Sequence, residues 1–284
     1  VVDSRDGDKK SLKAYDISTK KRRTVIEDKD VDLSSFFAID EAMFGRVGYE
    51  RPMWKTSDSA MQPHCAYLND HWGGVWQFVD TDSLRTLWSL VSNGDICTPK
   101  YFLYDRARAA VTFELPLFPP IDSALLSPTR HFEVKSRGNV RIPCFLTLPR
   151  GLVAENLPLV VKVHGGPHAR DEWGFDGENQ LFANRGWAVL QVNFRGSDGY
   201  GEKYLKSGLG QWSTGIIDDI FTAINKLIAD GTVDRDRVAI YGASYGGYAA
   251  LMAAAREPRR FVAGVAFAPV TDLIDLLSFS QGSK

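Results

Sequence analysis

Residues 241–248 read Tyr-Gly-Ala-Ser-Tyr-Gly-Gly-Tyr, and this stretch decides how the surrounding chain is interpreted. The apolar run 238–240 before it favours a strand, and the alanine-rich run after it favours a helix. A serine on so sharp a strand-to-helix turn needs small neighbours, because Cβ atoms leave no room where the strand and helix pass close together. The pattern therefore predicts that Ser244 is an exposed nucleophile.

Working outward from this turn, buried strands alternate with helices. The apolar spacing from Ile217 to Ile228 predicts one face of a helix, and Gly231 is its expected end. Strands are predicted over residues 157–163, 187–192, 237–241 and 261–268, the last of them buried; helices over 179–184 and 245–256; and a leading hairpin over 132–134 and 142–148. This alternation predicts an α/β fold with a doubly wound sheet that lacks its last strands, so the sheet is C-terminally incomplete.

The first 130 residues have a different pattern, which favours short strands and turns and includes no convincing amphipathic helix. Strands are predicted over residues 12–17, 75–79, 84–91, 100–104 and 110–115. Loosely similar hairpins begin at Asp16, Asp80 and Asp105, which is compatible with part of a β-propeller or with unrelated hairpins. The proline-rich segment 116–130 indicates a linker, so we predict a β-rich domain over 1–130 and an α/β domain over 131–284.

A serine nucleophile needs a base that takes its proton and donors that stabilise the oxyanion formed on attack. The backbone N–H of Tyr245, at the start of the following helix, is one expected donor. The second should come from the loop His164-Gly165-Gly166-Pro167-His168, which follows the strand at 157–163. Pro167 has no N–H, so Gly166 is the predicted second donor.

No base is evident for Ser244. None of the five histidines follows it, although hydrolases of this topology order their residues as Ser, then Asp or Glu, then His. We expect His164 and His168 to hold the glycine loop by hydrogen bonds, and the remaining histidines (His64, His71 and His131) to be structural or surface residues. Asp272 and Asp275 are expected in a loop or at a helix N-terminus, and neither is taken as a triad acid.

Composition excludes several other functions. With 34 Lys and Arg against 35 Asp and Glu, the net charge of −1 gives no reason to expect nucleic acid or an anionic membrane as partner. Three cysteines without CxxC spacing predict neither a disulfide framework nor a zinc site, and favour a reducing, cytoplasmic compartment. Nucleotide-binding glycine motifs are missing, and serine chemistry needs no metal or organic cofactor.

Both ends of the chain are expected to have been cut from something longer. The sequence begins with Val rather than Met, and it stops at Lys284, 40 residues after Ser244 (284 − 244). Its polar N-terminus lacks the apolar stretch of a signal peptide, and no apolar run approaches the length of a membrane span.

Three motifs give the chain a resemblance to a known family: Val163–Pro167 (VHGGP), Val192–Gly201 (VNFRGSDGYG) and Gly242–Tyr248 (GASYGGY). Their order and spacing are similar to those of the catalytic domain of prolyl oligopeptidase family serine peptidases, nearest the acylaminoacyl-peptidase and dipeptidyl-aminopeptidase-like members. The resemblance covers about residues 131–284. The segment Lys100–Arg106 also resembles the last propeller hairpin before that domain.

This resemblance implies an α/β-hydrolase domain that cleaves short peptides, preceded by a β-propeller that restricts entry. It implies Ser244 as nucleophile, with the Gly166 and Tyr245 amides as oxyanion hole. The N-terminal half holds only two or three blades, and the family's Asp and His have no counterparts, so we expect the chain to be inactive alone. A carboxylesterase or lipase of the same fold stays open, as does a non-catalytic protein whose sheet edge pairs with a partner or a second copy.

Overall fold

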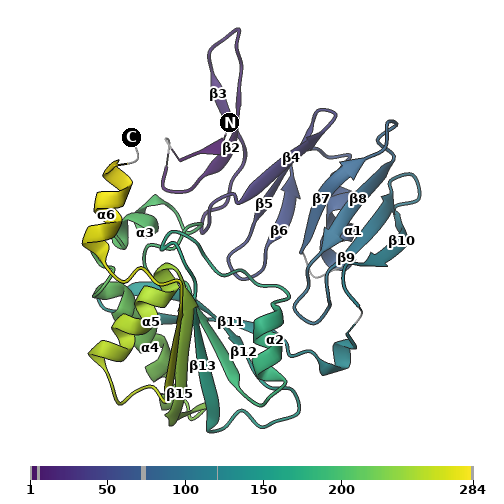
Figure 1. Cartoon of the computed structure of the whole chain (residues 1–284). Coiled ribbons are helices and arrows are strands. Elements are labelled where there is room, and N and C mark those ends of the chain that lie inside the picture. Colours follow the sequence, from purple (N-terminus) through teal and green to yellow (C-terminus); the bar gives the residue numbers. More distant parts are fainter. Residues whose placement is uncertain (1, 5–6, 72–74, 120, 283–284) are drawn as a thin grey trace. The chain divides into compact units, whose positions relative to one another are not determined.

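The computed structural model describes residues 2–4, 7–71, 75–119 and 121–282 (Figure 1). The chain forms two compact units: unit 1 comprises Val1–Pro128, Glu172–Gly177 and Gly199–Lys203, and unit 2 comprises Thr129–Asp171, Glu178–Asp198 and Tyr204–Lys284. The chain therefore passes between the units several times. The predicted domain boundary at residue 130 stays a prediction, and Pro120 of the expected linker lies outside the described residues.

Unit 2 contains a six-stranded sheet in the order β11-β12-β14-β13-β15-β16. The strands are β11 (Thr129–Ser136), β12 (Val140–Thr147), β13 (Leu157–Val163), β14 (Ala188–Val192), β15 (Val233–Ala243) and β16 (Ala263–Phe267). β11 and β12 form an antiparallel hairpin, and β12 pairs antiparallel with β14. The remaining neighbours pair in parallel. This arrangement confirms the predicted leading hairpin and the alternating strands behind it.

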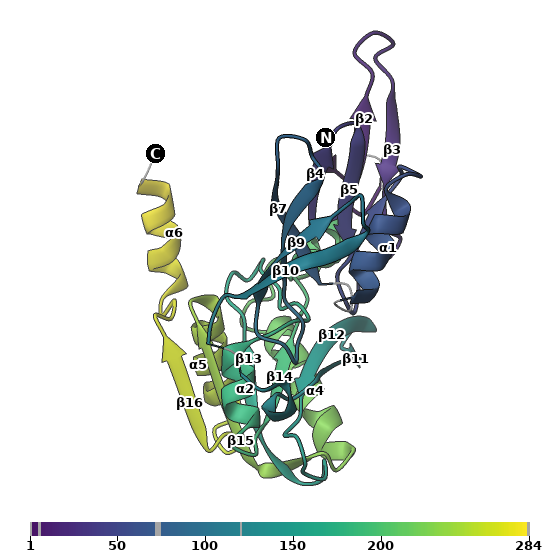
Figure 2. The same ribbon diagram turned by 90° about the vertical axis from the view of Figure 1, so that its right-hand side faces the viewer.

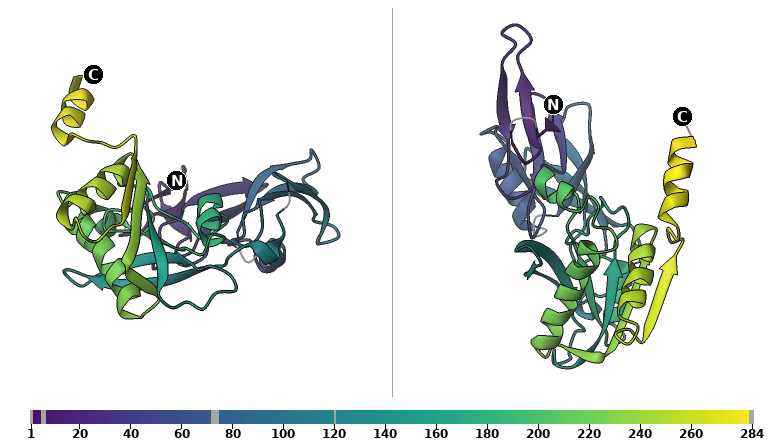
Figure 3. Two further views of the ribbon diagram at one scale, coloured as in Figure 1. Left: turned by 60° about the horizontal axis from the view of Figure 1, so that its bottom comes forward. Right: turned by 90° about the vertical axis from the view of Figure 1, so that its left-hand side faces the viewer.

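Helices lie on both faces of this sheet, as the views in Figures 1 and 3 show. α4 (Gly215–Ala229) and α5 (Tyr245–Arg256) cover one face, and α2 (Gly177–Ala183) covers part of the other. α3 (Glu202–Ser207) and α6 (Leu273–Gly282) complete the α-helices of this half of the chain. The predicted helices at 179–184, 217–228 and 245–256 are confirmed. Gly231 follows the end of α4 with a φ of 73°, as its C-cap assignment requires.

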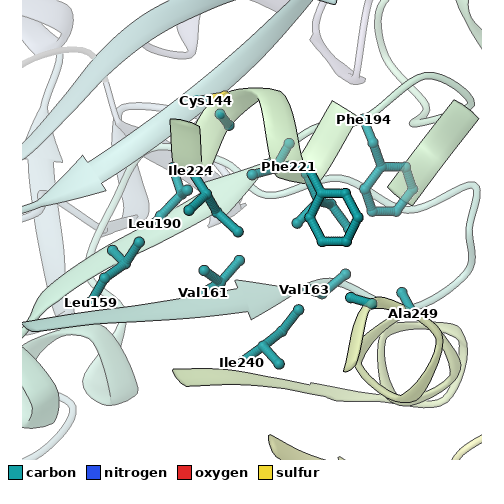
Figure 4. Packing of buried hydrophobic residues seen from close by; sticks show 14 of the residues in the cluster. Cys144, Leu159, Val161, Val163, Leu190, Phe194, Phe221, Ile224, Ile240 and Ala249 are labelled. Carbon is teal, nitrogen blue, oxygen red and sulfur yellow. The ribbon is translucent and has the colours of Figure 1, made fainter. Parts of the chain in front are cut away.

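The core of unit 2 lies between the sheet and α4 (Figure 4). Val161 and Ile240 project from neighbouring parallel strands and are almost fully buried, and Ile224 of α4 packs in the same cluster. Burial of each such side chain stabilises the fold by roughly 1.5–3 kcal/mol. The helical spacing of apolar residues in 217–228 thus marks the face of α4 that is buried.

The predicted burial of the strand at 261–268 is wrong. Val265 and Phe267 of β16 are 59% and 73% exposed. β16 is the edge strand, paired only with β15, and α5 packs against it on one face (Figure 2). An apolar run indicates a strand, but whether a neighbour covers it depends on elements elsewhere in the fold.

The described residues of unit 1 form three antiparallel sheets, in the orders β1-β2-β3, β4-β5-β6 and β10-β9-β8-β7. The strands are β1 (Val2–Asp3), β2 (Ser11–Tyr15), β3 (Arg22–Ile26), β4 (Ser35–Ile39), β5 (Ala42–Val47), β6 (Met53–Thr56), β7 (Trp76–Thr81), β8 (Leu87–Ser92), β9 (Lys100–Asp105) and β10 (Ala110–Pro116). The three predicted hairpins are present as β2-β3, β7-β8 and β9-β10. Fully buried Trp76, Trp88 and Phe44 belong to the core of this unit, so packing explains its aromatic content.

Unit 1 also contains α1 (Gln62–His71), a helix that the sequence analysis did not predict and that is not strongly amphipathic. Only Cys65 and Leu68 are buried in this ten-residue helix, so its apolar face is too narrow to detect in the sequence. The Asp58 carboxylate accepts hydrogen bonds from the N–H groups of Ala60 and Met61 just before the helix begins. A short 3₁₀ turn, η1 (Ser123–Leu125), lies in the expected linker.

Candidate active site

Ser244 occupies the predicted strand-to-helix turn between β15 and α5. Its φ of 56° and ψ of −120° lie outside the favoured regions for a residue with a side chain, which costs of order 1–3 kcal/mol. The turn is held from both sides, because the Ser244 N–H donates to the Phe267 carbonyl (3.0 Å) and its carbonyl accepts from the Tyr248 N–H (3.1 Å). The residue is exposed, and within the described residues its hydroxyl makes no hydrogen bond.

Glycine is required beside this turn because three backbones approach one another closely. A Cβ added to Gly246 would lie 2.1 Å from the carbonyl oxygen of Val163, which ends β13. A Cβ on Gly242 would lie 2.5 Å from the carbonyl carbon of Gly246. The small residues of the motif therefore let α5 begin directly against the ends of β13 and β15, as the sequence predicts.

The glycine loop after β13 runs next to Ser244. A Cβ built on Gly165 would lie 3.6 Å from the Cβ of Ser244 and 3.2 Å from the Ala243 carbonyl oxygen. Gly166 has a φ of 116°, and a Cβ there would meet the backbone nitrogen of His168 at 2.4 Å. Only glycine fits this conformation. The topology explains the juxtaposition, because β13 and β15 pair in parallel and their carboxyl ends meet at one sheet edge.

Tyr245 is the first residue of α5, so its N–H has no acceptor within the helix and lies at the positive end of the helix dipole. Its side chain is buried, and the hydroxyl donates to the Trp212 carbonyl (2.8 Å). The backbone amide of Tyr245 is thus placed by a fixed side chain. The fold brings the Gly165–Gly166 loop and the Ser244–Tyr245 turn together, and the oxyanion role of the two amides stays a prediction.

His164 contacts the backbone of the glycine loop, and His168 contacts the backbone of the segment that follows β14. The Nδ1 of His164 lies 2.8 Å from the Gly165 carbonyl oxygen and its Nε2 lies 3.0 Å from the Ser197 Oγ, while its ring stacks on Phe194. The Nδ1 of His168 lies 2.9 Å from the Gly196 carbonyl oxygen. A carbonyl only accepts, so each Nδ1 carries the hydrogen in these contacts. The geometry agrees with the expectation that both histidines hold the loop.

A buried polar network fastens the far end of this loop to the strand β14. The Asp171 N–H donates to the Asn193 Oδ1 (2.8 Å), and the Asn193 Nδ2 donates back to the Asp171 carbonyl (2.9 Å). The Gln191 Nε2 donates to the Asp171 Oδ1 (2.9 Å). Sequence reasoning assigned no role to these residues. The available signal was a buried-strand pattern interrupted by two amide side chains, which need partners when buried.

The segment that follows β14 is held by a buried ion pair between Arg195 and Asp219. Asp219 of α4 is fully buried and accepts hydrogen bonds from the Arg195 N–H (2.9 Å), Nε (2.8 Å) and Nη2 (2.7 Å). Hydrogen bonding to Asp219 raises the pKa of Arg195, despite partial burial. Asp219 was missed, although it lies three residues after Ile216 and four before Ala223, on the face of α4 that is buried.

Among the described residues, the other histidines and the acids predicted to be structural make no hydrogen bond to the Ser244 side chain. The Nδ1 of His64 lies 2.7 Å from the Tyr104 hydroxyl in unit 1, His71 stacks on Tyr67, and His131 packs on Phe145. Asp272 accepts from the N–H groups of Ile274 and Asp275 at the start of α6, as expected of a helix N-terminus.

The described residues show neither a metal-binding cluster nor a membrane-spanning helix. They contain no group of three His, Cys, Asp or Glu side chains placed to hold a metal ion. Nor does any helix among them combine the length and apolar character needed to cross a membrane.

Comparison with known proteins gives a consistent family match. Residues 173–281 match the prolyl oligopeptidase family, Peptidase_S9. The chain is 36% identical over 288 residues to dipeptidyl aminopeptidase BIII of Pseudoxanthomonas mexicana, covering 98% of this chain and 42% of that protein. It is 34% identical over 116 residues to acylamino-acid-releasing enzyme 1 of Oryza sativa subsp. japonica, covering 41% of this chain and 15% of that protein. The chain thus spans less than half the length of these relatives.

Solved structures show the same fold. A puromycin-hydrolyzing peptidase from Mycobacterium tuberculosis matches with a TM-score of 0.79 at 21% identity, over 98% of this chain and 43% of that one. A crystal structure of puromycin hydrolase matches with a TM-score of 0.78 at 20% identity, over 95% of this chain and 42% of that one. These likenesses confirm the predicted α/β architecture with a propeller-derived β-rich part.

Proposed function

Because the chain is a relative of the prolyl oligopeptidase family, we propose that it carries the nucleophile of a serine peptidase acting on short peptides. The observation that supports this most directly is the turn at Ser244, where an exposed hydroxyl lies at the start of α5 beside a glycine loop. The family match and the relatives' names support peptide substrates. No metal or organic cofactor enters this chemistry.

In the proposed reaction the Ser244 Oγ attacks the peptide carbonyl carbon while a base takes the hydroxyl proton. The carbonyl oxygen becomes an oxyanion, which the N–H groups of Gly166 and Tyr245 stabilise by hydrogen bonds. The C–N bond then breaks and the amine leaves with the proton, giving an acyl-enzyme that water hydrolyses. The strained turn at Ser244 and the hydrogen-bonded glycine loop support this proposal, because they restrict the movement of the attacking oxygen and of the two proposed donors.

The 284 residues by themselves are proposed to be inactive or nearly so. None of the histidines in the described residues hydrogen-bonds the Ser244 hydroxyl, and His164 and His168 are engaged with loop carbonyls. Loss of the triad histidine in an unrelated protease lowers turnover about a million-fold, which leaves only binding and oxyanion effects.

Fluorophosphonate labelling tests both the proposed nucleophile and the proposed inactivity of the 284-residue chain. We expect labelling of the 284-residue chain to be slow, with the label located at Ser244 by peptide mapping and lost in Ser244→Ala. Ser278→Ala is the matched control, because Ser278 is also exposed but lies within a helix, with its hydroxyl bonded to the Ile274 carbonyl. Rapid stoichiometric labelling of Ser244 would disprove inactivity, and undiminished labelling of Ser244→Ala would disprove the nucleophile.

A carboxylesterase or lipase would use the same acyl-transfer groups, because this machinery does not distinguish an ester from an amide. Turnover of a p-nitrophenyl ester without turnover of peptides by an active form would favour that alternative.

A non-catalytic role in association is favoured by a different observation. Val265 and Phe267 of the edge strand β16 are exposed apolar side chains, and so is Val262 just before that strand. Under this alternative, size-exclusion chromatography should show a defined oligomer that Phe267→Lys dissociates, with no labelling of Ser244.

A further inference from the structure

A cavity of about 480 Å³ lies in unit 2, at the end of β15 remote from Ser244. It is bounded by the last turns of α4, the start of β15 and the turn that follows α5. Arg235 near the start of β15 lines it, whereas Ser244 follows the end of that strand. At about 3.3 Å per residue, roughly 25–30 Å separate the two places.

Four arginines line this cavity, and two of them are anchored. The Arg256 Nη2 donates to the Asp218 Oδ1 (2.6 Å) and its Nη1 donates to the Thr214 carbonyl (3.1 Å). The Arg260 Nη1 donates to the Asn225 Oδ1 (2.7 Å), and its Nε contacts Glu257. A guanidinium has five N–H groups, so each anchored arginine keeps donors that these contacts do not use.

Both anchored guanidinium groups also stack near one aromatic ring. Arg256 lies 5.4 Å and Arg260 lies 5.0 Å from the ring centroid of Phe221. A shared ring and fixed acceptors restrict the positions of these two cations, so little side-chain entropy would be lost when they bind a further anion.

Arg235 and Arg259 are the remaining cations. Both are exposed, and neither makes an ion pair or a side-chain hydrogen bond with the residues that the structure describes. Arg259 lies in a turn closed by the hydrogen bond from the Arg260 N–H to the Glu257 carbonyl (3.0 Å), with Pro258 at its second position. Proline presets the backbone of such a turn, so Arg259 is presented from a fixed loop.

The charges around the cavity do not balance. Four arginines and the two carboxylates of Asp236 and Glu257 line the cavity, and Asp218 pairs with Arg256 from outside the lining, which leaves a formal excess of one positive charge (4 − 3). Of these carboxylates, Glu257 already pairs with Arg260. Cations gathered in one concavity repel each other and attract anions, so this excess favours an anionic ligand.

We propose that this cavity binds the phosphate group of a small organic phosphomonoester. Each guanidinium can donate two parallel hydrogen bonds to a pair of phosphate oxygens. A carboxylate has only two oxygens, so it would accept fewer of the donors that the arginines offer. The volume lies in the range of sites for small organic ligands, and the apolar lining residues Ile228 and Pro258 offer contact to the organic part. This ligand site is independent of the proposed peptidase reaction.

Isothermal titration calorimetry of the 284-residue chain with phenyl phosphate tests this. We expect saturable 1:1 binding that weakens as salt rises and that Arg235→Gln/Arg259→Gln weakens at least about tenfold. Arg130→Gln is the matched control, since Arg130 is an exposed arginine of unit 2 outside the cavity, and binding should not change. Circular dichroism of each variant verifies that it is folded.

Two comparisons decide the chemistry of the ligand. Phenol, which lacks the phosphate, should not bind measurably, whereas inorganic phosphate should bind more weakly than phenyl phosphate. Equal affinities for inorganic and phenyl phosphate would overturn the organic part of the proposal. Absence of binding, or binding that the folded double variant leaves unchanged, would overturn the site itself.

Discussion

Ser244 has a positive φ of 56° at the turn between β15 and α5. The sequence predicted this turn from Gly242, Gly246 and the flanking strand and helix patterns. The reason for glycine at position 246, the carbonyl of Val163 on β13, became visible only in the fold. A local motif can indicate that space is short without showing which distant residue fills it.

Gly246→Ala should destabilise the protein by about 3 kcal/mol, because its new Cβ would collide with the Val163 backbone, which has little freedom to move. Urea denaturation followed by circular dichroism measures this. Gly264→Ala is the control, because a Cβ there would meet only the Ile240 Cγ2 at an ordinary 3.9 Å. Similar midpoints for the two variants would contradict the proposed steric requirement.

The cysteines should differ in reactivity with iodoacetamide at pH 8. Burial raises the pKa of Cys65 to about 11, and burial raises the pKa of the fully buried Cys144. The thiolate is the reactive form, and a pKa of about 11 leaves about one Cys65 in a thousand ionised at that pH. Cys97 is only half-buried, so it should be alkylated first.

Mass spectrometry of timed samples locates the label on each cysteine. In urea all three cysteines should react at similar rates, which serves as the control. If Cys65 or Cys144 were alkylated as fast as Cys97 in the folded protein, these thiols would be accessible to solvent rather than buried.

At the scale of elements, local patterns located strands well but did not fix their burial. The strands β13 and β16 both read as apolar runs, yet β13 lies inside the sheet and β16 at its edge. α1 escaped prediction for the complementary reason, because only two of its side chains are buried and helix propensity alone is weak.

Substitutions in β15 and β16 should therefore differ in cost. Ile240→Ala removes a buried side chain from β15 and should destabilise the protein by about 2–5 kcal/mol. Phe267→Ser changes a side chain that is 73% exposed and should alter stability by less than about 0.5 kcal/mol. Urea midpoints at low protein concentration compare them, and a large loss in Phe267→Ser would mean that its ring is covered in solution.

At the scale of the whole molecule, the chain returns to unit 1 after entering unit 2. Residues 199–203 belong to unit 1, and Asp32 holds them there. Its Oδ2 accepts from the Gly201 N–H (3.1 Å), its Oδ1 accepts from the Lys10 N–H (2.6 Å), and its own N–H donates to the Gly199 carbonyl (2.9 Å). The sequence analysis predicted a single boundary near residue 130, because the composition changes there. The return segment, residues 199–203, has no local sequence pattern that would assign it to unit 1.

Asp32→Asn should destabilise unit 1 by about 1.5–3 kcal/mol, because one buried carboxylate oxygen that accepts an N–H is replaced by an amide donor. Thermal unfolding followed by tryptophan fluorescence reports on the buried indoles of unit 1. Asp30→Asn is the control: its carboxylate is 55% exposed, and the change should be close to neutral. Equal shifts in Tm would argue against a role for Asp32 in holding the return segment.

Local sequence patterns were enough to predict the elements around Ser244, the hairpins of the β-rich half, and the glycines that a sharp turn needs. These follow from side-chain period and backbone sterics, which act over a few residues. Tertiary structure alone decided that β16 is exposed, that Asp219 neutralises Arg195, and that four arginines converge on one cavity. Those features depend on residues brought together from distant parts of the chain, and only the packed sheet and helices specify which neighbours each side chain meets.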